Sequence, residues 1–138
     1  MKKQIDVVGA VVIRNGAVLA ARRGAQMSLP GKWEFPGGKI EAGERAENAL
    51  VREMLEELLC PVRVGKHVTT ATHEYDFGVV TISTFYATLI NSEPRRTEHS
   101  EIRWIPIPDL RSVEWAPADI PTVQRIMREH ADRPIPEE

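Results

Sequence analysis

The stretch that decides the fold is Gly38 to Cys60, GKIEAGERAENALVREMLEELLC, in which a glycine-containing turn runs into an amphipathic helix. At about 100° per residue, Glu53, Glu56 and Glu57 share one face of that helix. Apolar residues fall on the opposite flank, where a core can cover them: Val51, Met54, Leu55 and Leu58. Three acids on a packed helix suit Mg²⁺ or Mn²⁺, which prefer oxygen ligands and complete their shells with waters and substrate phosphates.

Acidic helix faces are usually only solvated, so the residues around the three glutamates matter. Arg52 stands four residues before Glu56, where it can pair with a carboxylate and fix its rotamer. An ordinary surface salt bridge is the alternative for Arg52. Glu44 precedes the helix, and it is either a capping carboxylate or a partner for Arg52.

The spacing of these residues resembles the Nudix box, GX5EX7REUXEEXGU, in which U is aliphatic. The positions in register are Gly38, Glu44, Arg52, Glu53, Met54, Glu56 and Glu57. The departure is Leu59, which stands where the family has glycine. That glycine normally ends the helix in a left-handed conformation, which leucine tolerates poorly. We therefore expect a differently shaped helix end, with Pro61 stopping the helix.

The chain has 138 residues, enough for one domain with one substantial core. Hydrophobic residues make up 42% and charged residues 28%, which is typical of a soluble globular protein. The net charge of −2 gives no electrostatic footprint for duplex nucleic acid. The single Cys60 excludes an intramolecular disulfide, and no segment near the start is long enough to span a bilayer. We expect a cytoplasmic protein, monomeric or homodimeric.

The pattern of apolar residues and turn signals predicts an α/β protein. Strands are expected at 5–14, 17–22, 33–35, 62–70, 73–77, 79–90 and 102–105. Helices are expected at 45–58 and 120–130, with a helical turn at 107–110. Asn15-Gly16 indicates a type I′ hairpin, and Gly24 to Lys32 a loop. These elements favour a mixed β-sheet covered on both faces.

The Nudix resemblance implies the same arrangement, an α/β/α sandwich with a mixed β-sheet between helices, over nearly the whole chain. We expect a single domain at 1–133, and Pro134 to Glu138 to be a flexible tail.

The resemblance also implies a metal site and a catalytic group. The expected metal ligands are Gly37, Gly38, Glu53, Glu56, Glu57 and Glu98, where the glycines offer backbone carbonyls and Glu98 comes from the polar loop 91–100. The expected catalytic residues are Glu53, Arg52, Glu44 and Glu98. Glu53 is the first choice for the group that activates water and Glu98 the second. A solvated loop carboxylate is the alternative for Glu98.

The stretch WEFPGGKIEAGE resembles the MutT-like branch of the family, which acts on nucleoside triphosphates. Residues expected to bind substrate are Arg23, Glu34, Phe35, Gly37, Gly38, Lys39 and Asp119. Arg22-Arg23 resembles the arginine pair of that branch, with Arg23 toward the nucleotide and Arg22 open to solvent. Phe35 either lines the nucleoside pocket or is simply part of the core.

The C-terminal run WAPADIPTVQRIM, with TEHSEIRW before it, resembles the CTP pyrophosphohydrolase subgroup. Asp119 stands where the 8-oxo-dGTP enzymes carry an asparagine that reads the base. An ionised Asp119 would only accept hydrogen bonds, which suits the N4 amino group of cytosine. The purine nucleotide 8-oxo-dGTP also stays possible as a substrate, if Asp119 need not donate a hydrogen bond to O6 of the base. A role as the N-cap of the last helix is the alternative.

The remaining chemistry-bearing residues show weaker signals. His67, His73, His99 and His130 have no metal-ligand spacing; we expect His67, His99 and His130 to be exposed or on edge strands, whereas His73 beside Tyr75 could reach the nucleoside. We expect Trp33, Trp104 and Trp115 in the core or pocket wall, and Cys60 as inert packing.

Together these features predict a Mg²⁺-dependent hydrolase, with Mn²⁺ as a possible substitute. It would convert a nucleoside triphosphate, modified or of the cytidine type, to the monophosphate and pyrophosphate, in sanitation of the nucleotide pool. One alternative is another diphosphate substrate, such as ADP-ribose, a dinucleoside polyphosphate or an RNA 5′ end. A Nudix module that binds nucleotide without turnover is a second alternative.

Overall fold

The computed structural model describes residues 2–130. Its strands are β1 (Gln4–Val11), β2 (Ile13–Arg14), β3 (Ala17–Arg22), β4 (Trp33–Glu34), β5 (Gly37–Lys39), β6 (Val62–Tyr75), β7 (Gly78–Leu89) and β8 (Glu101–Pro106). Its helices are α1 (Ala46–Leu58) and α2 (Ile120–Glu129), with 3₁₀ turns η1 (Ile107–Ser112) and η2 (Pro117–Asp119). The predicted α/β class is confirmed.

The strands form two sheets. In the first, ordered β5-β1-β7-β6, the central β1 and β7 are parallel and the outer pairs antiparallel, so this sheet is mixed as predicted. In the second, β3 pairs antiparallel with β2, β4 and β8. The two sheets part at Val12, which lies between β1 and β2 and whose carbonyl accepts a hydrogen bond from the Leu19 N–H.

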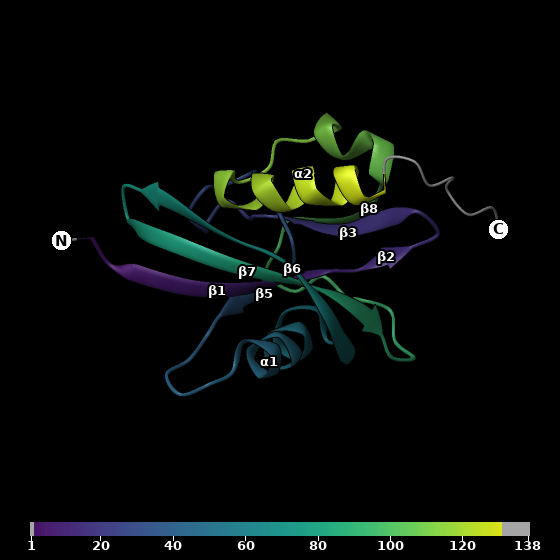
Figure 1. Ribbon diagram of the computed structural model, residues 1–138, viewed down its shortest axis with the longest axis horizontal. Helices are drawn as coiled ribbons and strands as arrows, with labels where there is room; N and C mark the ends of the chain where they lie inside the picture. The colour runs from purple at the N-terminus through teal and green to yellow at the C-terminus, as the bar shows by residue number, and fades with distance from the viewer. Residues whose placement is uncertain (1, 131–138) are drawn as a thin grey trace.

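The two helices lie on opposite sides of the strands (Figure 1), which confirms the predicted α/β/α sandwich. Successive side chains of a strand point to opposite faces of the sheet, so β1 contributes residues to the core on both faces. Val8 and Ala10 join the core cluster that contains Met54 of α1, whereas Val11 joins the cluster that contains Ile126 of α2. The second half of β1 is buried on both faces, and residues 7–11 accordingly form a continuous apolar run.

Local signals in the sequence were reliable where glycine or proline set the backbone. Asn15 and Gly16 have φ of 53° and 76°, and Arg14 pairs with Ala17, as the type I′ hairpin requires. The predicted break between strands at 70–73 is absent, since β6 is continuous and its residues 71 and 72 pair with β7. No turn residue interrupts that stretch, so the ladder with β7 carries through.

The end of α1 differs from the expectation. Leu59 adopts the left-handed conformation itself, with φ 53° and ψ 34°, and the Cys60 N–H bonds the Met54 carbonyl. The expectation of a different helix end was therefore wrong: the hydrogen-bonded cap forms with leucine at the strained position. Leu55 was also predicted to be covered, but it is 46% exposed, because it lies about 100° around the helix from the buried Met54.

The prediction of one domain at 1–133 with a tail at 134–138 lies partly outside the described residues, since residues 131–138 are not among them. Within residues 2–130, no helix is long and apolar enough to cross a membrane.

Candidate functional site

A cavity of about 680 Å³ opens between α1, β5, the loop after β3 and the start of α2. All seven residues predicted to bind substrate line it: Arg23, Glu34, Phe35, Gly37, Gly38, Lys39 and Asp119. Arg52 and the three acids of α1 line it too. Glu44 and Glu98, two of the predicted catalytic residues, do not. One cavity therefore unites the acidic face of α1 with the predicted nucleotide wall.

The Gly37-Gly38 pair lets α1 approach β5. In β5, Gly37 pairs with Gly9 and Gly38 with Val8 of β1. A Cβ on Gly37 would run into the Val8 carbonyl, and a Cβ on Gly38 would run into the Glu53 carboxylate. The absence of side chains at both positions therefore sets Glu53 against the β5 backbone.

Arg52 organises the acids around it. Its Nε and Nη2 donate to the two carboxylate oxygens of Glu44 at 2.9 Å each, and its Nη1 donates to Glu53 at 2.9 Å. Its Nη2 also donates to the Lys39 carbonyl at 2.9 Å. Hydrogen bonding from Arg52 lowers the pKa of Glu44 to about 2. Of the two readings of Glu44, the structure gives the partner of Arg52, because the N-cap of α1 is Arg45 and has no side-chain cap bond.

The three acids of α1 differ in exposure. The side chains of Glu53 and Glu57 are 14% and 24% exposed, whereas that of Glu56 is 60% exposed. Burial raises the pKa of Glu53 against the opposing effect of Arg52. Burial also raises the pKa of Glu57 to about 7; His99 opposes the shift, and the charges of Glu34, Glu53 and Glu98 add to it.

These acids fit a hard divalent cation by their donor chemistry. The carboxylates of α1 and the backbone of Gly37-Gly38 offer oxygen alone, and their mutual repulsion is of the kind that a cation relieves. Among residues 2–130, no three acidic, histidine or cysteine side chains are already arranged around a common metal position. Arg52 contacts Glu53 through Oε2 and His99 lies beside Glu57 Oε2, so an ion would be bound through the other oxygen of each carboxylate.

Glu98 lies near this face but not in the cavity wall. It is exposed in the loop 91–100, and its charge reaches Glu57. The loop is tied to the end of α1, where Thr97 Oγ1 donates to the Glu57 carbonyl at 2.5 Å and the Arg95 N–H to the Leu58 carbonyl at 2.8 Å. The metal and catalytic roles of Glu98 therefore stay predictions.

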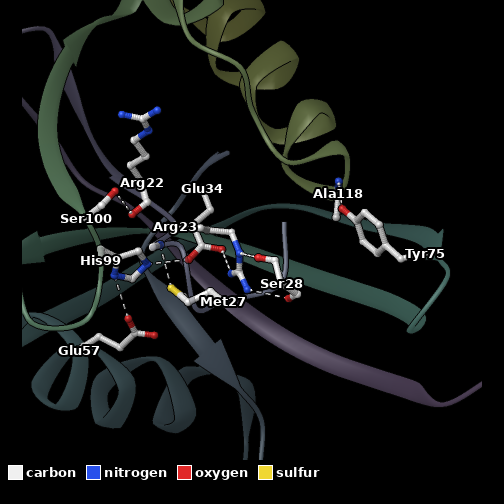
Figure 2. Close-up of polar contacts among 11 residues, drawn as sticks. Arg22, Arg23, Met27, Ser28, Glu34, Glu57, Tyr75, His99, Ser100 and Ala118 are labelled. Carbon is white, nitrogen blue, oxygen red and sulfur yellow. Dashed lines mark hydrogen bonds and ion pairs between the residues drawn. The ribbon is translucent and has the colours of Figure 1, made fainter. Parts of the chain in front are cut away.

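His99 is the residue that the sequence analysis missed. It was expected to be exposed or on an edge strand, but it is 1% exposed, because it turns inward between β4 and α1. Figure 2 shows its ring between Glu34 and Glu57, with Nε2 2.7 Å from Glu34 Oε2 and Nδ1 3.3 Å from Glu57 Oε2. Burial would lower the pKa of His99, but its hydrogen bond to Glu34 and the charges of both glutamates outweigh that effect and raise the pKa.

Glu34 binds His99 through Oε2, and its Oε1 contacts a second residue, Arg23. Arg23 Nη1 lies 2.6 Å from Glu34 Oε1, and Arg23 also donates to Ser28 in the loop after β3 (Figure 2). Arg22 is exposed, as expected, and donates to the Gly31 carbonyl. The sequence could not reveal the Glu34–His99 contact, because 65 residues separate the two and no local spacing signals it.

Asp119 lies at the far end of the cavity and is 4% exposed. Its carboxyl accepts a hydrogen bond from the Phe35 backbone N–H, and its Oδ1 is buried without a partner. Burial, with the charge of Glu34, raises its pKa well above the ordinary value. Burial therefore opposes the ionised form of Asp119 that the cytosine argument assumed, although the charge of Arg23 favours that form. Asp119 stands at the N-cap position of α2, as the alternative predicted, but its side chain makes no capping hydrogen bond there.

Aromatic side chains form the cavity wall beside Asp119. Phe35 is 3% exposed and stacks on Trp115 with ring centroids 4.8 Å apart, as its core alternative required. It also lines the cavity, and its contact with a nucleoside stays a prediction. Tyr75 and Phe77 also line the cavity and stack on each other, and the Tyr75 hydroxyl accepts the Ala118 N–H at 2.8 Å. His73, which was expected near the nucleoside, contacts the Tyr75 ring but is exposed and does not line the cavity.

The comparisons with known proteins agree with this geometry. A family model described as NUDIX domain matches residues 3–126. A CTP pyrophosphohydrolase of Escherichia coli K12 is 35% identical over 132 residues, covering 96% of this chain and 98% of the relative. An 8-oxo-dGTP diphosphatase of the same organism is 30% identical over 128 residues, covering 93% and 99%.

A solved structure leads to the same family. The solution structure of a MutT protein of the Nudix hydrolase family from methicillin-resistant Staphylococcus aureus 252 is 50% identical, with a TM-score of 0.77, covering 94% of this chain and 99% of that one. The chain belongs to the NUDIX family, and within it to the MutT-like hydrolases. Nudix hydrolases generally need a divalent metal ion.

Proposed function

We propose that this hydrolase converts a nucleoside triphosphate to the monophosphate and pyrophosphate, with cytidine-type or oxidised deoxynucleotides as the preferred substrates. The observation that carries the proposal is the single cavity that joins the acidic face of α1 to Arg23, Phe35 and Asp119. A triphosphate at the acidic end leaves its base at the aromatic end. The names and full-length coverage of the relatives support this substrate class.

The acidic end is proposed to hold Mg²⁺, with Mn²⁺ as a substitute, through Glu53, Glu56, Glu57 and the Gly37-Gly38 backbone. A bound divalent ion neutralises phosphate charge and lowers the pKa of bound water. Lys39 and Arg23 line the same cavity, where their positive charges favour the polyphosphate. Arg52 keeps Glu53 in one rotamer, because it holds that carboxylate and the Lys39 carbonyl at once.

Glu53 is the proposed group that takes the proton from the attacking water, and Glu98 is the second candidate. Glu53 is supported by its place in the cavity wall beside the ligands of the proposed metal. Attack at the β-phosphorus is the expectation from the family resemblance, and it gives pyrophosphate as the leaving product. Arg52 and Glu44 act through Glu53 by fixing it.

Asp119 is proposed to contact the base as a neutral carboxyl. A neutral carboxyl has one donor and one acceptor, as the amide of asparagine has. Cytosine offers the complementary N3 acceptor and N4 donor, and 8-oxoguanine offers O6 and the N7–H. An ionised Asp119 would favour cytosine, whereas a neutral carboxyl suits both bases, so both substrates stay within the proposal.

The test is a comparison of pyrophosphate release from CTP, dCTP, 5-methyl-dCTP, dGTP and 8-oxo-dGTP. The wild type should favour a cytidine-type or oxidised nucleotide over dGTP. Glu53→Gln should lower the rate with the best substrate by at least about two orders of magnitude, the range for loss of a proton-transfer group. An unchanged rate in Glu53→Gln would contradict the assignment, and release only from ADP-ribose or dinucleoside polyphosphates would contradict the substrate class.

The physiological setting follows from the reaction. We propose a cytoplasmic protein with a single Nudix domain at 1–133, acting on the free nucleotide pool as a monomer or homodimer. The net charge of −2 supports a free nucleotide over a nucleic-acid duplex.

A further inference from the structure

The network around His99 connects the two ends of the cavity. Glu34 has one oxygen on Arg23 at 2.6 Å and the other on His99 Nε2 at 2.7 Å. On the opposite side of the ring, Nδ1 lies 3.3 Å from Glu57 Oε2. A continuous row thus runs from Arg23 in the proposed nucleotide wall to Glu57 on the acidic face of α1, and His99 links the two glutamates (Figure 2).

The second ring nitrogen of His99, Nδ1, is fully buried and has no hydrogen-bond partner among residues 2–130, although Glu57 Oε2 lies 3.3 Å away. A buried polar nitrogen without a partner costs free energy, so the position favours a Glu57 rotamer that forms a hydrogen bond with Nδ1. Carboxylates that bind a metal are commonly held by a hydrogen bond from a neighbouring group. His99 offers that hydrogen bond.

The backbone on either side of His99 is fixed, so its ring cannot follow Glu57 away. Thr97 and Arg95 are bonded to the carbonyls of the last turn of α1. On the other side, the Ser100 N–H donates to the Arg22 carbonyl of β3 at 2.9 Å. The ring is thus held between β3 and α1, at a place fixed by both.

We propose that His99 is a positioning residue that orients Glu57 for the divalent ion and Glu34 for the nucleoside, and so couples the two ends of the cavity. The proposal rests on the proposed function, since it assumes that Glu57 binds the metal and that Glu34 faces the substrate. His99 contacts neither the substrate nor the reacting atoms. It acts through the two carboxylates that it separates.

Two substitutions separate the contact of His99 with Glu34 from its contact with Glu57. The amide nitrogen of Gln takes the place of Nε2, so His99→Gln keeps the contact with Glu34 and loses the one with Glu57. The amide nitrogen of Asn takes the place of Nδ1, so His99→Asn does the reverse. The matched controls are His67→Gln and His67→Asn, since His67 is exposed on β6 and does not line the cavity.

The readouts are two binding measurements without turnover. Mn²⁺ binding to the free protein is followed by electron paramagnetic resonance, and binding of CMP and 8-oxo-dGMP is followed by calorimetry in EDTA. His99→Gln should weaken Mn²⁺ binding about tenfold and leave monophosphate binding near wild type. His99→Asn should weaken monophosphate binding about tenfold and leave Mn²⁺ binding near wild type. Equal losses in both variants, or no loss in either, would overturn the proposal.

A wild-type measurement keeps the proposal testable if both variants unfold. In ¹⁵N spectra of the imidazole nitrogens, Mg²⁺ should shift His99 Nδ1 more than the nitrogens of His67. Absence of such a shift, with Mg²⁺ bound, would refute the coupling.

A separate variant distinguishes failure of the proposed function. If Glu57→Gln binds Mn²⁺ as the wild type does, the proposed metal site is wrong. If Glu57→Gln is impaired while His99→Gln is not, only the role of His99 is wrong.

Discussion

At the scale of single residues, Asp119 shows how burial changes what a side chain can do. It is buried, and among residues 2–130 the only hydrogen bond to its carboxyl comes from the Phe35 backbone N–H. Desolvation favours the neutral form, which can donate as well as accept. The chemistry offered to a base at this position therefore depends on the cavity as much as on the residue type.

The raised pKa of Asp119 predicts a dependence of stability on pH. An acid whose pKa is raised by folding contributes stability below its unfolded pKa of about 3.9, and that contribution is lost as pH rises toward the folded value. Asp119→Asn removes this titration while keeping the shape of the group. The variant should therefore gain stability relative to wild type as pH rises from about 4 to 7.

Urea unfolding of both proteins at pH 4, 5, 6 and 7 measures this difference in the free energy of unfolding. Other groups titrate equally in both proteins and cancel. A difference that stays constant, or that shrinks as pH rises, would show that Asp119 is ionised in the fold.

Gly38 gives a second prediction at this scale. Gly38→Ala would place a Cβ against the Glu53 carboxylate, the movable end of a flexible side chain. The variant should fold with a melting temperature close to wild type, but kcat should fall about a hundredfold, the usual cost of a small misplacement of a catalytic group.

Two other glycines serve as references for Gly38→Ala. Gly65→Ala should leave both kcat and melting temperature near wild type, since its nearest neighbour, Tyr86 O, is at an ordinary 3.4 Å. Gly37→Ala meets the Val8 carbonyl of β1 and should destabilise the fold. Full activity in Gly38→Ala would contradict the proposed position of Glu53.

At the scale of elements, α1 owes its shape to tertiary packing more than to its end residue. Leu59 holds a left-handed conformation that costs an L-residue roughly 1–2 kcal/mol. The buried Met54, Leu58 and Cys60 on either side of it anchor the helix and the start of β6. Packing of these side chains offsets the strain, so the cap forms where local propensity opposes it.

Replacement of Leu59 tests that strain. Leu59→Gly should raise the free energy of unfolding by about 1 kcal/mol relative to Leu59→Ala, because both lose the same exposed side chain but only glycine relieves the left-handed backbone. Thermal and urea unfolding of the two variants provide the comparison. Equal stabilities of the Gly and Ala variants would mean that the backbone at this position is not strained.

At the scale of the whole molecule, the sequence predicted the individual elements better than the tertiary contacts between them. The acidic face of α1, the Asn15-Gly16 hairpin and the α/β/α class follow from short-range periodicity and turn chemistry. The burial of His99 and Asp119 does not, because it arises where β4, the loop 91–100 and the start of α2 come together from distant parts of the chain.

The same reason explains the other errors. Local propensity places Leu59 outside a left-handed cap and leaves β6 in two pieces, whereas packing and pairing with β7 decide otherwise. The ionisation of Asp119 cannot be known until its surroundings are known. The sequence thus predicts which acids are present, and the fold decides which of them remain charged.

The measurement that tests the central claim most directly is a crystal structure with Mn²⁺ and a non-hydrolysable nucleoside triphosphate analogue. The anomalous signal of manganese locates the ion independently of the surrounding model. The account predicts Mn²⁺ bound by carboxylates from Glu53, Glu56 and Glu57 and by phosphate oxygens of the analogue. Manganese and phosphates bound elsewhere, with that face of α1 contacting only solvent, would contradict it.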